Sequence, residues 1–508
     1  METYQQFIDG VLVDSHSPEW IEVENPYTNE VIARAPRGDA EDADRAVAAA
    51  SAAQPGWAKR APVARAAYLK KFADAIRAHR VELAKTLASE QAKILPLAQV
   101  EIDVTAEYFD YYAGWARIYE GEIINSDDPR ENILLFQKPI GVVAGICPWN
   151  FPFFVMARKV APSLLAGCTT IIKPSSNTPA TTFEFAKLVA SLDLPPGVLN
   201  FVSGGGATLG KALVKHPDVD MVSLTGSVEA GQEILRDAAD KVMKTSLELG
   251  GKAPAIVFGD ADLDIAAKGV TDSRLIFGGQ VCNCAERVYV HASIYDEFVA
   301  KLKASFEAAA FGDPFGDPTP VYSSQIDAAQ LEKIDAMVQR AVAAGAEVVT
   351  GGRPADVGTG YFYEPTLIAG ATQDSEILQK EVFGPVLPIV KWDDYDQVIK
   401  DANDCEYGLT SSIFTTNVNT VMQAVKDLNF GETYVNREHF EGIQGFHAGW
   451  RKSGIGGADG KHGLYEYLQS QVVYIRYGRP SRRRPERPTG AGGAATGRAP
   501  TRDDVPAV

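Results

Sequence analysis

The feature that most constrains the fold is an alternation of short β-branched runs with helical stretches, which starts near residue 142. The β-branched runs occupy 142–146, 169–173, 198–202 and 220–224, and helical spacing lies near 152–166, 178–191, 206–215 and 228–239. Such alternation predicts parallel strands joined by right-handed helical crossovers. The pattern restarts after residue 253 and continues to about residue 310. The sequence therefore predicts two α/β domains, and 508 residues are enough for two or three.

The two ends of the chain differ from this body. Near the N-terminus, residues 39–54 and 62–93 carry apolar residues at helical spacing, and Asp39 is the expected N-cap of the first segment. After Tyr477 the chain is rich in Arg, Pro and Gly and has no apolar period. We therefore expect residues 478–508 to be a disordered, solvated extension rather than a docking tail.

Charge and cysteine content exclude several classes of partner. The formal net charge is −17, which argues against nucleic acid or an anionic membrane as the main partner. The five cysteines are an odd number, and no secretion signal is recognisable at the start, so a cytoplasmic location is expected. No apolar run is long enough to cross a bilayer.

Three short runs carry residues suited to covalent aldehyde oxidation. Cys282 lies in GGQVCNCAER, Glu248 in LELGGK and Asn150 in PWNFPFF. A thiol attacks an aldehyde carbon, an amide holds the resulting oxyanion, and a carboxylate activates water. Each residue alone has a plainer interpretation, since a lone Cys is usually buried apolar volume and Asn150 is placed to cap a helix that begins near Phe151. The three runs together favour the catalytic interpretation.

These runs also carry a family resemblance. From about Phe7 to about Tyr474 the chain resembles the NAD(P)-dependent aldehyde dehydrogenase superfamily, through NPYT, PWNFPF, IIKP, LTGSVEAG, LELGGK, GQVC, EVFGP and YGLTSSIF. Within the superfamily it is most similar to bacterial lactaldehyde and glycolaldehyde dehydrogenases, through GQVCNCAERVYV at 279–290 and the long segment at 430–464.

The resemblance implies a domain organisation. It implies an α/β fold with a Rossmann-type dinucleotide-binding domain from residues 1–121 and 141–252, and an α/β catalytic domain from residues 253–464. Residues 122–140 and 465–477 are expected to form a small oligomerisation sheet. The expected partners are a small-molecule aldehyde and further copies of the chain, as a dimer or a homotetramer, with no nucleic acid and no membrane.

The resemblance also assigns catalytic roles. Cys282, the second residue after Gly-Gln, is the nucleophile, and its backbone N–H forms the oxyanion hole with the Asn150 side chain. Glu248 is the general base, and relatives that transfer the acyl group to coenzyme A lack it, so a free acid is expected. If the local chain is extended, Cys284 is a second thiol near the site. Cys147, Cys168 and Cys405 are expected in the core, and no metal is expected.

A dinucleotide site is expected around LTGSVEAG, where Gly226, Ser227 and Gly231 follow a strand and open a helix able to hold pyrophosphate. By resemblance, further contacts come from other segments. Lys173 reaches the adenosine ribose, Glu381 the nicotinamide ribose with Phe383 beside it, and Trp149 and Gln330 add contacts. Close relatives usually carry Glu where this chain has Ser176, so we expect NADP to be accepted as well as NAD.

The aldehyde pocket is predicted beside Asn150. Helical spacing places Phe151, Phe154, Val155 and Arg158 on one face, and an Arg there suits a polar or anionic group on a short aldehyde. By resemblance, Glu441 and His447 line the same pocket, with Asn283 next to the nucleophile. The alternatives are an Arg158–Glu441 ion pair that only shapes the wall, and a His447 that only packs in its loop.

Together these observations predict a non-acylating, NAD(P)-dependent aldehyde dehydrogenase. The expected reaction oxidises a small hydroxyaldehyde such as lactaldehyde or glycolaldehyde to its acid, through a Cys thiohemiacetal and a thioester. The alternatives are another short polar aldehyde, such as a semialdehyde, or an inactive structural or binding protein on the same fold. The sequence leaves open the physiological aldehyde, the preference between NAD and NADP, and the choice between dimer and tetramer.

Overall fold

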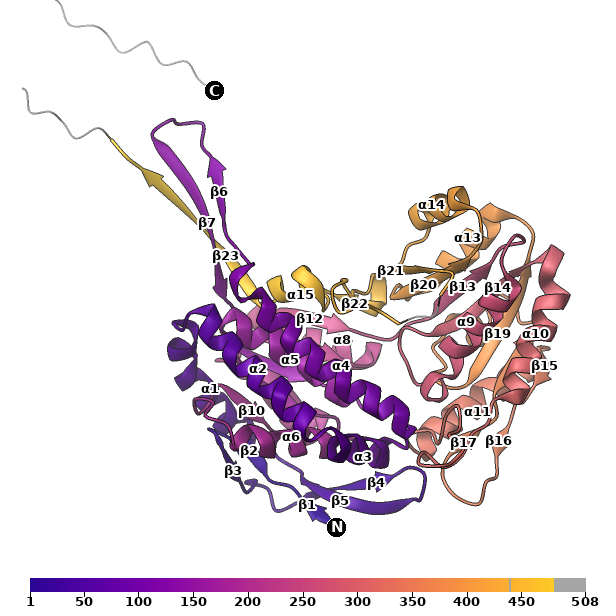
Figure 1. Cartoon of the computed structure of the whole chain (residues 1–508), viewed down its shortest axis with the longest axis horizontal. Helices are drawn as coiled ribbons and strands as arrows, with labels where there is room; N and C mark the ends of the chain where they lie inside the picture. The colour runs from indigo at the N-terminus through magenta and orange to yellow at the C-terminus, as the bar shows by residue number, and fades with distance from the viewer. Residues whose placement is uncertain (438–439, 479–508) are drawn as a thin grey trace, which may run out of the picture. The chain divides into compact units, whose positions relative to one another are not determined.

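The computed structural model describes residues 1–437 and 440–478, so most of the segment predicted to be disordered, residues 479–508, lies outside the described residues. Contacts between Cα atoms divide the chain into two units. The first contains Met1–Glu120 and Gln137–Ser470, and it carries two large sheets and their helices (Figure 1). The second contains Gly121–Phe136 and, within the described residues, 471–478.

The first large sheet has eight strands within the described residues. Its parallel centre has the order β12-β11-β8-β9-β10. These strands are β8 (Val142–Ile146), β9 (Thr169–Lys173), β10 (Leu199–Phe201), β11 (Met221–Thr225) and β12 (Lys244–Glu248). Their crossover helices are α5 (Pro152–Ala166), α6 (Ala180–Ala190), α7 (Lys211–Lys215) and α8 (Val228–Ala238). The predicted strands and helices therefore occur within a few residues of their expected places.

Antiparallel strands border this parallel centre. The hairpin of β2 (Gln6–Ile8) and β3 (Val11–Val13) joins the β10 edge. At the other edge, β22 (Gly454–Ile455) pairs with β12 in antiparallel register, Gly454 opposite Glu248. The chain thus returns to the first sheet after completing the second, which differs from the expected assignment of residues 253–464 to the catalytic domain. Strand β22 is only two residues long, so no sequence pattern predicted this pairing.

The second large sheet has the order β15-β18-β19-β14-β13-β20-β21, and all its neighbouring strands are parallel except the β15–β18 pair at one edge. Its strands are β13 (Ala253–Val257), β14 (Ala285–His291), β15 (Glu347–Thr350), β18 (Thr366–Ala369), β19 (Val386–Trp392), β20 (Thr410–Phe414) and β21 (Glu432–Val435). Helices α9 (Leu263–Leu275), α10 (Tyr295–Ala308), α11 (Ala328–Ala343), α13 (Tyr395–Asn403) and α14 (Val418–Asp427) connect them (Figure 1).

The N-terminal helices differ in part from the prediction. Helix α1 (Ala40–Ala58) has the expected cap, since the Asp39 side chain accepts from two backbone N–H groups. The stretch 62–93 is two helices, α2 (Pro62–Ala78) and α3 (Arg80–Gln91), which meet at the non-helical His79. No Gly or Pro marks that break. Helix α4 (Leu95–Gly114) was not predicted, although it buries Ile102, Phe109 and other residues at helical spacing.

A three-stranded sheet is formed by β6 (Glu122–Asn125), β7 (Glu131–Pro139) and β23 (Leu468–Arg476), in the order β23-β7-β6. Strands β6 and β7 are an antiparallel hairpin. Several apolar side chains of these strands are exposed, with Ile123 80% and Tyr474 65% accessible. The exposed residues also include Ile124, Phe136, Val472 and Ile475.

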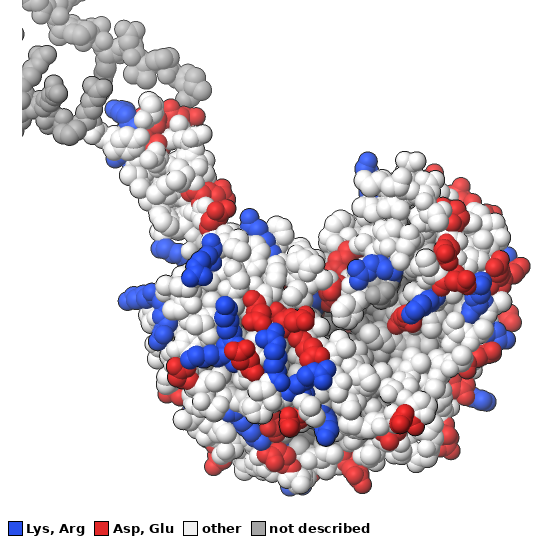
Figure 2. All heavy atoms as spheres, in the orientation of Figure 1, with Lys and Arg blue, Asp and Glu red and all other residues white. Residues whose placement is uncertain are grey.

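The surface carries both signs of charge in mixture, since Figure 2 shows Lys and Arg side chains interspersed with Asp and Glu on the face drawn. No helix in the described part of the chain combines the length and apolar character needed to span a membrane.

Candidate active site

Cys282 lies in a tightly constrained loop between α9 and β14. Phe277, Gly278 and Gly279 all have left-handed φ angles, of 48°, 60° and 76°. A Cβ on Gly279 would lie 2.1 Å from the carbonyl oxygen of Gly384, so only glycine fits there. A Cβ on Gly251 would lie 2.2 Å from the carbonyl oxygen of Cys282. The glycine of the LELGGK run therefore lets that segment approach the backbone of Cys282 closely.

Asn150 precedes α5, but its side chain does not cap that helix. The backbone N–H groups of Phe153 and Phe154 instead donate to the Glu101 carboxylate, at 3.0 and 3.2 Å. The Asn150 amide donates one hydrogen bond to the carbonyl of Gln280, at 3.0 Å. A side-chain amide has two N–H donors, so one remains for a ligand. The helix-cap interpretation of Asn150 is therefore wrong, because Glu101 takes that position.

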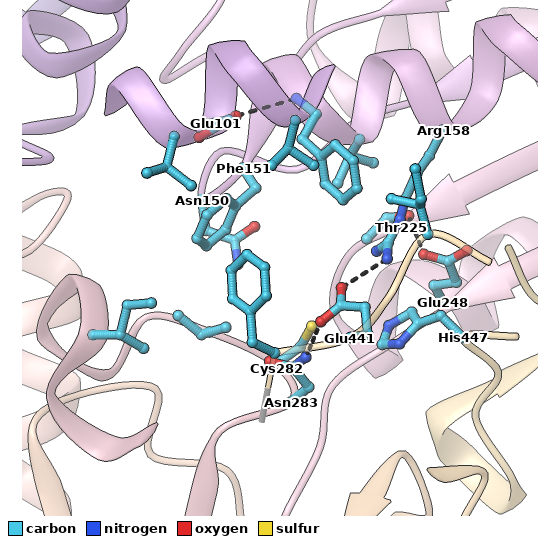
Figure 3. Close-up of a pocket in the computed structure, with 18 of the residues that line it drawn as sticks. Glu101, Asn150, Phe151, Arg158, Thr225, Glu248, Cys282, Asn283, Glu441 and His447 are labelled. Carbon is cyan, nitrogen blue, oxygen red and sulfur yellow. Dashed lines mark hydrogen bonds and ion pairs between the residues drawn. The ribbon is translucent and has the colours of Figure 1, made fainter. Parts of the chain in front are cut away.

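Glu248 ends β12 and is almost completely buried. Thr225, which ends the neighbouring strand β11, donates to its carboxylate at 3.2 Å. Parallel strands bring both residues to the same edge of the sheet. Glu248, Asn150 and Cys282 all line one pocket (Figure 3). Residues from three sequence runs, up to 132 positions apart, therefore meet around a common space.

This first pocket has an apolar wall and a polar wall. The apolar wall comes from α4, α5 and neighbouring loops, and it includes Leu97, Val100, Val104, Phe151, Phe154, Val155, Ile276 and Val281. The polar wall includes Arg158, Asn283, Glu441 and His447, so every residue predicted for the substrate pocket lines it. Because helix α4 was not predicted from the sequence, its contribution to the apolar wall was not predicted either.

The polar wall is a connected network (Figure 3). Arg158 donates to Glu441 at 2.7 Å, and Asn283 donates to the other oxygen of that carboxylate at 2.6 Å. Burial alone would raise the pKa of Glu441, but Arg158 holds it at about 2. The Arg158–Glu441 ion pair anticipated as the alternative is therefore present. Arg158 also pairs with Asp459, at 2.6 Å, which the sequence did not indicate.

His447 is held in place by Glu432 of strand β21 and by its own backbone pairing. Its Nδ1 lies 2.9 Å from the Glu432 carboxylate, and its backbone pairs with Ala458 in both directions. Burial works to lower the pKa of His447, but the Glu432 carboxylate raises it well above the usual range. His447 is thus buried as one half of an ion pair, with its ring in the lining of the pocket.

A second pocket shares Asn150, Thr225, Glu248, Cys282 and His447 with the first. Its other walls contain most of the residues predicted to hold the dinucleotide: Trp149, Lys173, Ser176, Gly226, Ser227, Gln330, Glu381 and Phe383. The amino end of α8 faces it through Ser227 and Ala230, and such an end favours phosphate. Burial lowers the pKa of Lys173 to about 8. The second pocket therefore combines a cation, a helix terminus, an aromatic ring and a carboxylate. This combination fits an NAD(P) molecule.

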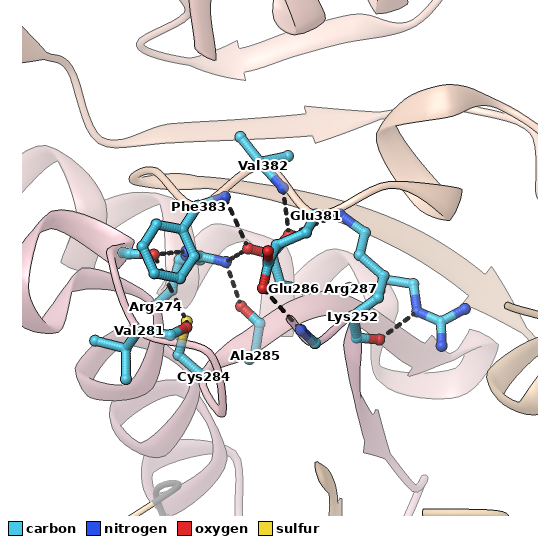
Figure 4. A network of polar contacts seen from close by, with 12 residues as sticks. Lys252, Arg274, Val281, Cys284, Ala285, Glu286, Arg287, Glu381, Val382 and Phe383 are labelled. Carbon is cyan, nitrogen blue, oxygen red and sulfur yellow. Dashed lines mark hydrogen bonds and ion pairs between the residues drawn. The ribbon is translucent and has the colours of Figure 1, made fainter. Parts of the chain in front are cut away.

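A buried ion cluster supports the wall that carries Glu381 and Phe383 (Figure 4). Glu286 pairs with Lys252 at 2.7 Å and with Arg274 at 2.6 Å. Its carboxylate also accepts from the backbone N–H groups of Val382 and Phe383. Phe383 has a φ of 59°, a conformation that L residues rarely adopt without such support. Gln330 adds a hydrogen bond of 2.8 Å to the Phe383 carbonyl.

Two residues lie elsewhere than the sequence predicted. Gly231 is not among the residues lining the second pocket; it packs on Leu249, where a Cβ would come within 2.6 Å of a side-chain carbon. Its role is close packing of α8 against the segment after β12. Cys284 is buried and bonds to the Val281 carbonyl at 2.9 Å, because residues 282–284 form a turn rather than an extended strand. Burial raises its pKa to about 12.

Cys147 and Cys168 are buried, as expected, while Cys405 is partly exposed, and all five cysteines are unpaired. Within residues 1–437 and 440–478, no cluster of three or more His, Cys, Asp or Glu side chains suits a metal ion.

Comparisons with known proteins show the family to which this chain is similar. A family model described as the aldehyde dehydrogenase family matches residues 12–473. Lactaldehyde dehydrogenase of Escherichia coli (strain K12) is 53% identical over 473 residues, covering 93% of this chain and 98% of that protein. The crystal structure of that E. coli enzyme has a TM-score of 0.92 and covers 94% of this chain and 100% of the solved chain. A 3,6-anhydro-L-galactose dehydrogenase solved with NADP has a TM-score of 0.91 at 42% identity, covering 93% and 100%.

Proposed function

The chain belongs to the aldehyde dehydrogenase family, and from this premise we propose that it oxidises a small hydroxyaldehyde such as lactaldehyde or glycolaldehyde to the carboxylic acid. It is an NAD(P)-dependent oxidoreductase that acts on small aldehydes. The substrate proposal is supported by the 53% identity to a lactaldehyde dehydrogenase and by the polar wall of the pocket that Cys282 also lines.

One observation carries the proposal: a small pocket with hydroxyl-binding side chains opens beside a thiol that also borders the dinucleotide pocket. Arg158 and Asn283 supply N–H donors, and Glu441 supplies an acceptor. A hydroxyl next to an aldehyde both donates and accepts, so it is complementary to such a wall. The apolar wall from α4 and α5 limits the size of the carbon chain.

In the proposed reaction Cys282 attacks the aldehyde carbon as a thiolate, since the thiolate is the nucleophilic form. The free N–H of Asn150 and the backbone N–H of Cys282 donate to the oxygen, which becomes negatively charged as the carbon becomes tetrahedral. A nicotinamide held in the second pocket, which Glu381 and Phe383 line, would supply the hydride acceptor, and loss of hydride from that carbon would leave a thioester on Cys282.

Hydrolysis then completes the cycle. Glu248 takes a proton from water as the water oxygen attacks the thioester carbon, and the Cys282 sulfur leaves as the acid forms. Thr225 holds the Glu248 carboxylate through its hydroxyl. A carboxylate at this place supports release of a free acid rather than transfer to coenzyme A.

We also propose a cytoplasmic location and a dimer or tetramer joined through the sheet β23-β7-β6. Five unpaired cysteines favour a reducing compartment. The exposed apolar residues of the sheet favour contact with another copy of the chain.

The test is a steady-state assay of the purified full chain with lactaldehyde, glycolaldehyde, propanal and succinic semialdehyde, each with NAD and with NADP. We expect the two hydroxyaldehydes to have the highest kcat/KM, and propanal is the matched substrate without a hydroxyl. A higher kcat/KM for succinic semialdehyde would favour the semialdehyde alternative. Equal values for propanal and lactaldehyde would contradict the proposed role of the polar wall.

A further inference from the structure

We propose that Asp459 is a positioning residue that makes the pocket selective for uncharged aldehydes, because its carboxylate occupies and neutralises the Arg158 guanidinium. The inference rests on the proposed function and deepens it by excluding substrates that carry a carboxylate. Arg158 by itself indicates the opposite preference, since a guanidinium is well suited to bind carboxylates.

Asp459 holds Arg158 with two parallel hydrogen bonds. The Arg158 Nε donates to one carboxylate oxygen at 3.1 Å, and a terminal nitrogen donates to the other at 2.6 Å. This paired geometry is the strongest that an arginine makes with a carboxylate. Tyr108 donates its hydroxyl to the same carboxylate at 2.8 Å. Asp459 is fully buried and is not part of the pocket lining, so it acts on the substrate only through Arg158.

The backbone around Asp459 is held as firmly as its side chain. Its φ of 72° is left-handed, which is unusual for a residue other than glycine. The carbonyl of Asp459 accepts from Gly463 in helix α15 (Gly460–Tyr465). The preceding residue, Ala458, pairs with His447 in both directions. The segment that supplies Asp459 is therefore fixed to the loop that supplies His447 to the pocket.

The charges of this wall decide what it accepts. Arg158 contacts two carboxylates, Asp459 at 2.6 Å and Glu441 at 2.7 Å, so one cation faces two anions. His447 is matched by Glu432. Burial raises the pKa of Asp459, and the guanidinium of Arg158 acts in the opposite direction. A substrate carboxylate would enter a place that already holds an excess of negative charge, and like charges in contact are strongly disfavoured.

An uncharged hydroxyl meets no such penalty. The three bonds from Arg158 to Asp459 and Glu441 use only part of the five N–H donors of a guanidinium. The side chain still offers donors to a neutral oxygen, while Glu441 offers an acceptor. Asp459 thus converts an anion-binding arginine into a donor for neutral polar groups.

The test replaces Asp459 by its uncharged isostere, D459N, and measures kcat and KM for glycolaldehyde and for succinic semialdehyde. We expect the ratio of kcat/KM for the semialdehyde to that for glycolaldehyde to rise about tenfold or more, mainly through a lower KM for the anion. The matched control is Y108F, which removes a hydrogen bond to the same carboxylate without changing its charge. In Y108F the ratio should stay within about twofold of the wild-type ratio.

The outcomes separate the inference from the proposed function. If D459N lowers kcat/KM for both aldehydes by the same factor, Asp459 is only structural and the inference fails, while the proposed function stands. If the wild-type chain oxidises no hydroxyaldehyde, the proposed function itself fails. Should D459N not fold, the wild-type chain gives the answer with succinic semialdehyde and 4-hydroxybutanal. A wild-type preference for the carboxylate of this pair would overturn the inference, and a preference for the hydroxyl would support it.

Discussion

Glu248 and Cys282 line the same pocket but are proposed to act at different times, and this makes their roles separable. In the proposed reaction Cys282 attacks the aldehyde in the first half, and Glu248 activates water in the second. A variant that lacks only the second function should therefore complete one oxidation and then stop.

We predict this for E248Q, which keeps the shape of the side chain and removes its basicity. Mixing with NADP and glycolaldehyde should give a burst of reduced cofactor close to one equivalent per site, followed by turnover reduced about 10²–10⁴-fold. Stopped-flow absorbance measures both phases. C282A is the control and should give neither phase. A steady rate without a burst in E248Q would place Glu248 outside the hydrolysis step.

The side chain at position 176 is predicted to influence the choice between NAD and NADP. Its hydroxyl donates to the Gly204 carbonyl at 3.4 Å, and it lines the second pocket. Since a carboxylate there repels the 2′-phosphate, S176E should lower kcat/KM for NADP by about tenfold or more relative to that for NAD. S175A is the neighbouring control and should leave this ratio near its wild-type value. An unchanged ratio in S176E would remove Ser176 from the adenosine site.

Three residues that the sequence predicted for the site, and that line one pocket in the structure, share a property. Asn150, Glu248 and Cys282 each stand in a short run of Gly or Pro with a distinctive chemistry, so local pattern was enough to select them. Asp459 has no such signal, because its partner Arg158 is 301 positions away. Contacts between residues so far apart in the chain depend on how the two sheets are assembled. The local spacing of residues in the sequence carries no information about that assembly.

At the scale of elements, buried parallel strands were the easiest to predict. β8, β9 and β11 are short buried runs rich in β-branched and apolar residues, and they occur within one residue of where the sequence placed them. The separation of α2 from α3 was missed because His79 is neither Gly nor Pro, and its modestly lower helix propensity than that of Ala78 and Arg80 is too small to mark a break. Arg80, the first residue of α3, pairs with Asp103 of α4 at 2.6 Å. That tertiary contact lies at the break and has no local signature.

The ion cluster beneath the 381–383 loop gives a prediction for stability. In E286Q, Lys252 and Arg274 would remain buried without their carboxylate, which should destabilise the fold by about 3–5 kcal/mol. Thermal and urea unfolding measure the loss. E376Q removes an exposed ion pair with Arg340 and should cost only about 0–1 kcal/mol. Equal losses in the two variants would contradict a structural role for the cluster.

The same cluster has a pH dependence. Burial alone would raise the pKa of Glu286, but Arg274 and Lys252 lower it to about 2, below the ordinary value of about 4.3 for an unfolded chain. A carboxyl with a lowered pKa contributes stability above the unfolded pKa. That contribution is lost as pH falls from about 4.3 to about 2. E286Q should therefore show a weaker loss of stability over this interval than the wild-type chain.

At the scale of the whole molecule, the sheet β23-β7-β6 is the expected contact between copies. Apolar side chains as exposed as Ile123 and Tyr474 are typical of surfaces that a partner covers. We predict that I123D combined with Y474D lowers the mass measured by size-exclusion chromatography with light scattering. V418D changes an equally exposed apolar residue, 68% accessible, in helix α14, and it should leave the mass unchanged. A loss of mass in V418D alone would move the contact away from this sheet.

The pairing of β22 with β12 has a consequence for how the protein matures during translation. Glu441, His447 and Asp459 all follow the second large sheet in the chain, and Gly454 sits opposite Glu248. Domains tend to fold in order as they leave the ribosome, N-terminal parts first. A nascent chain that has completed the second large sheet and the parallel centre of the first would still lack Glu441 and His447 of its pocket, and it would lack the edge strand β22 beside Glu248. We therefore expect the pocket to be complete only near the end of synthesis, after both domains have largely formed.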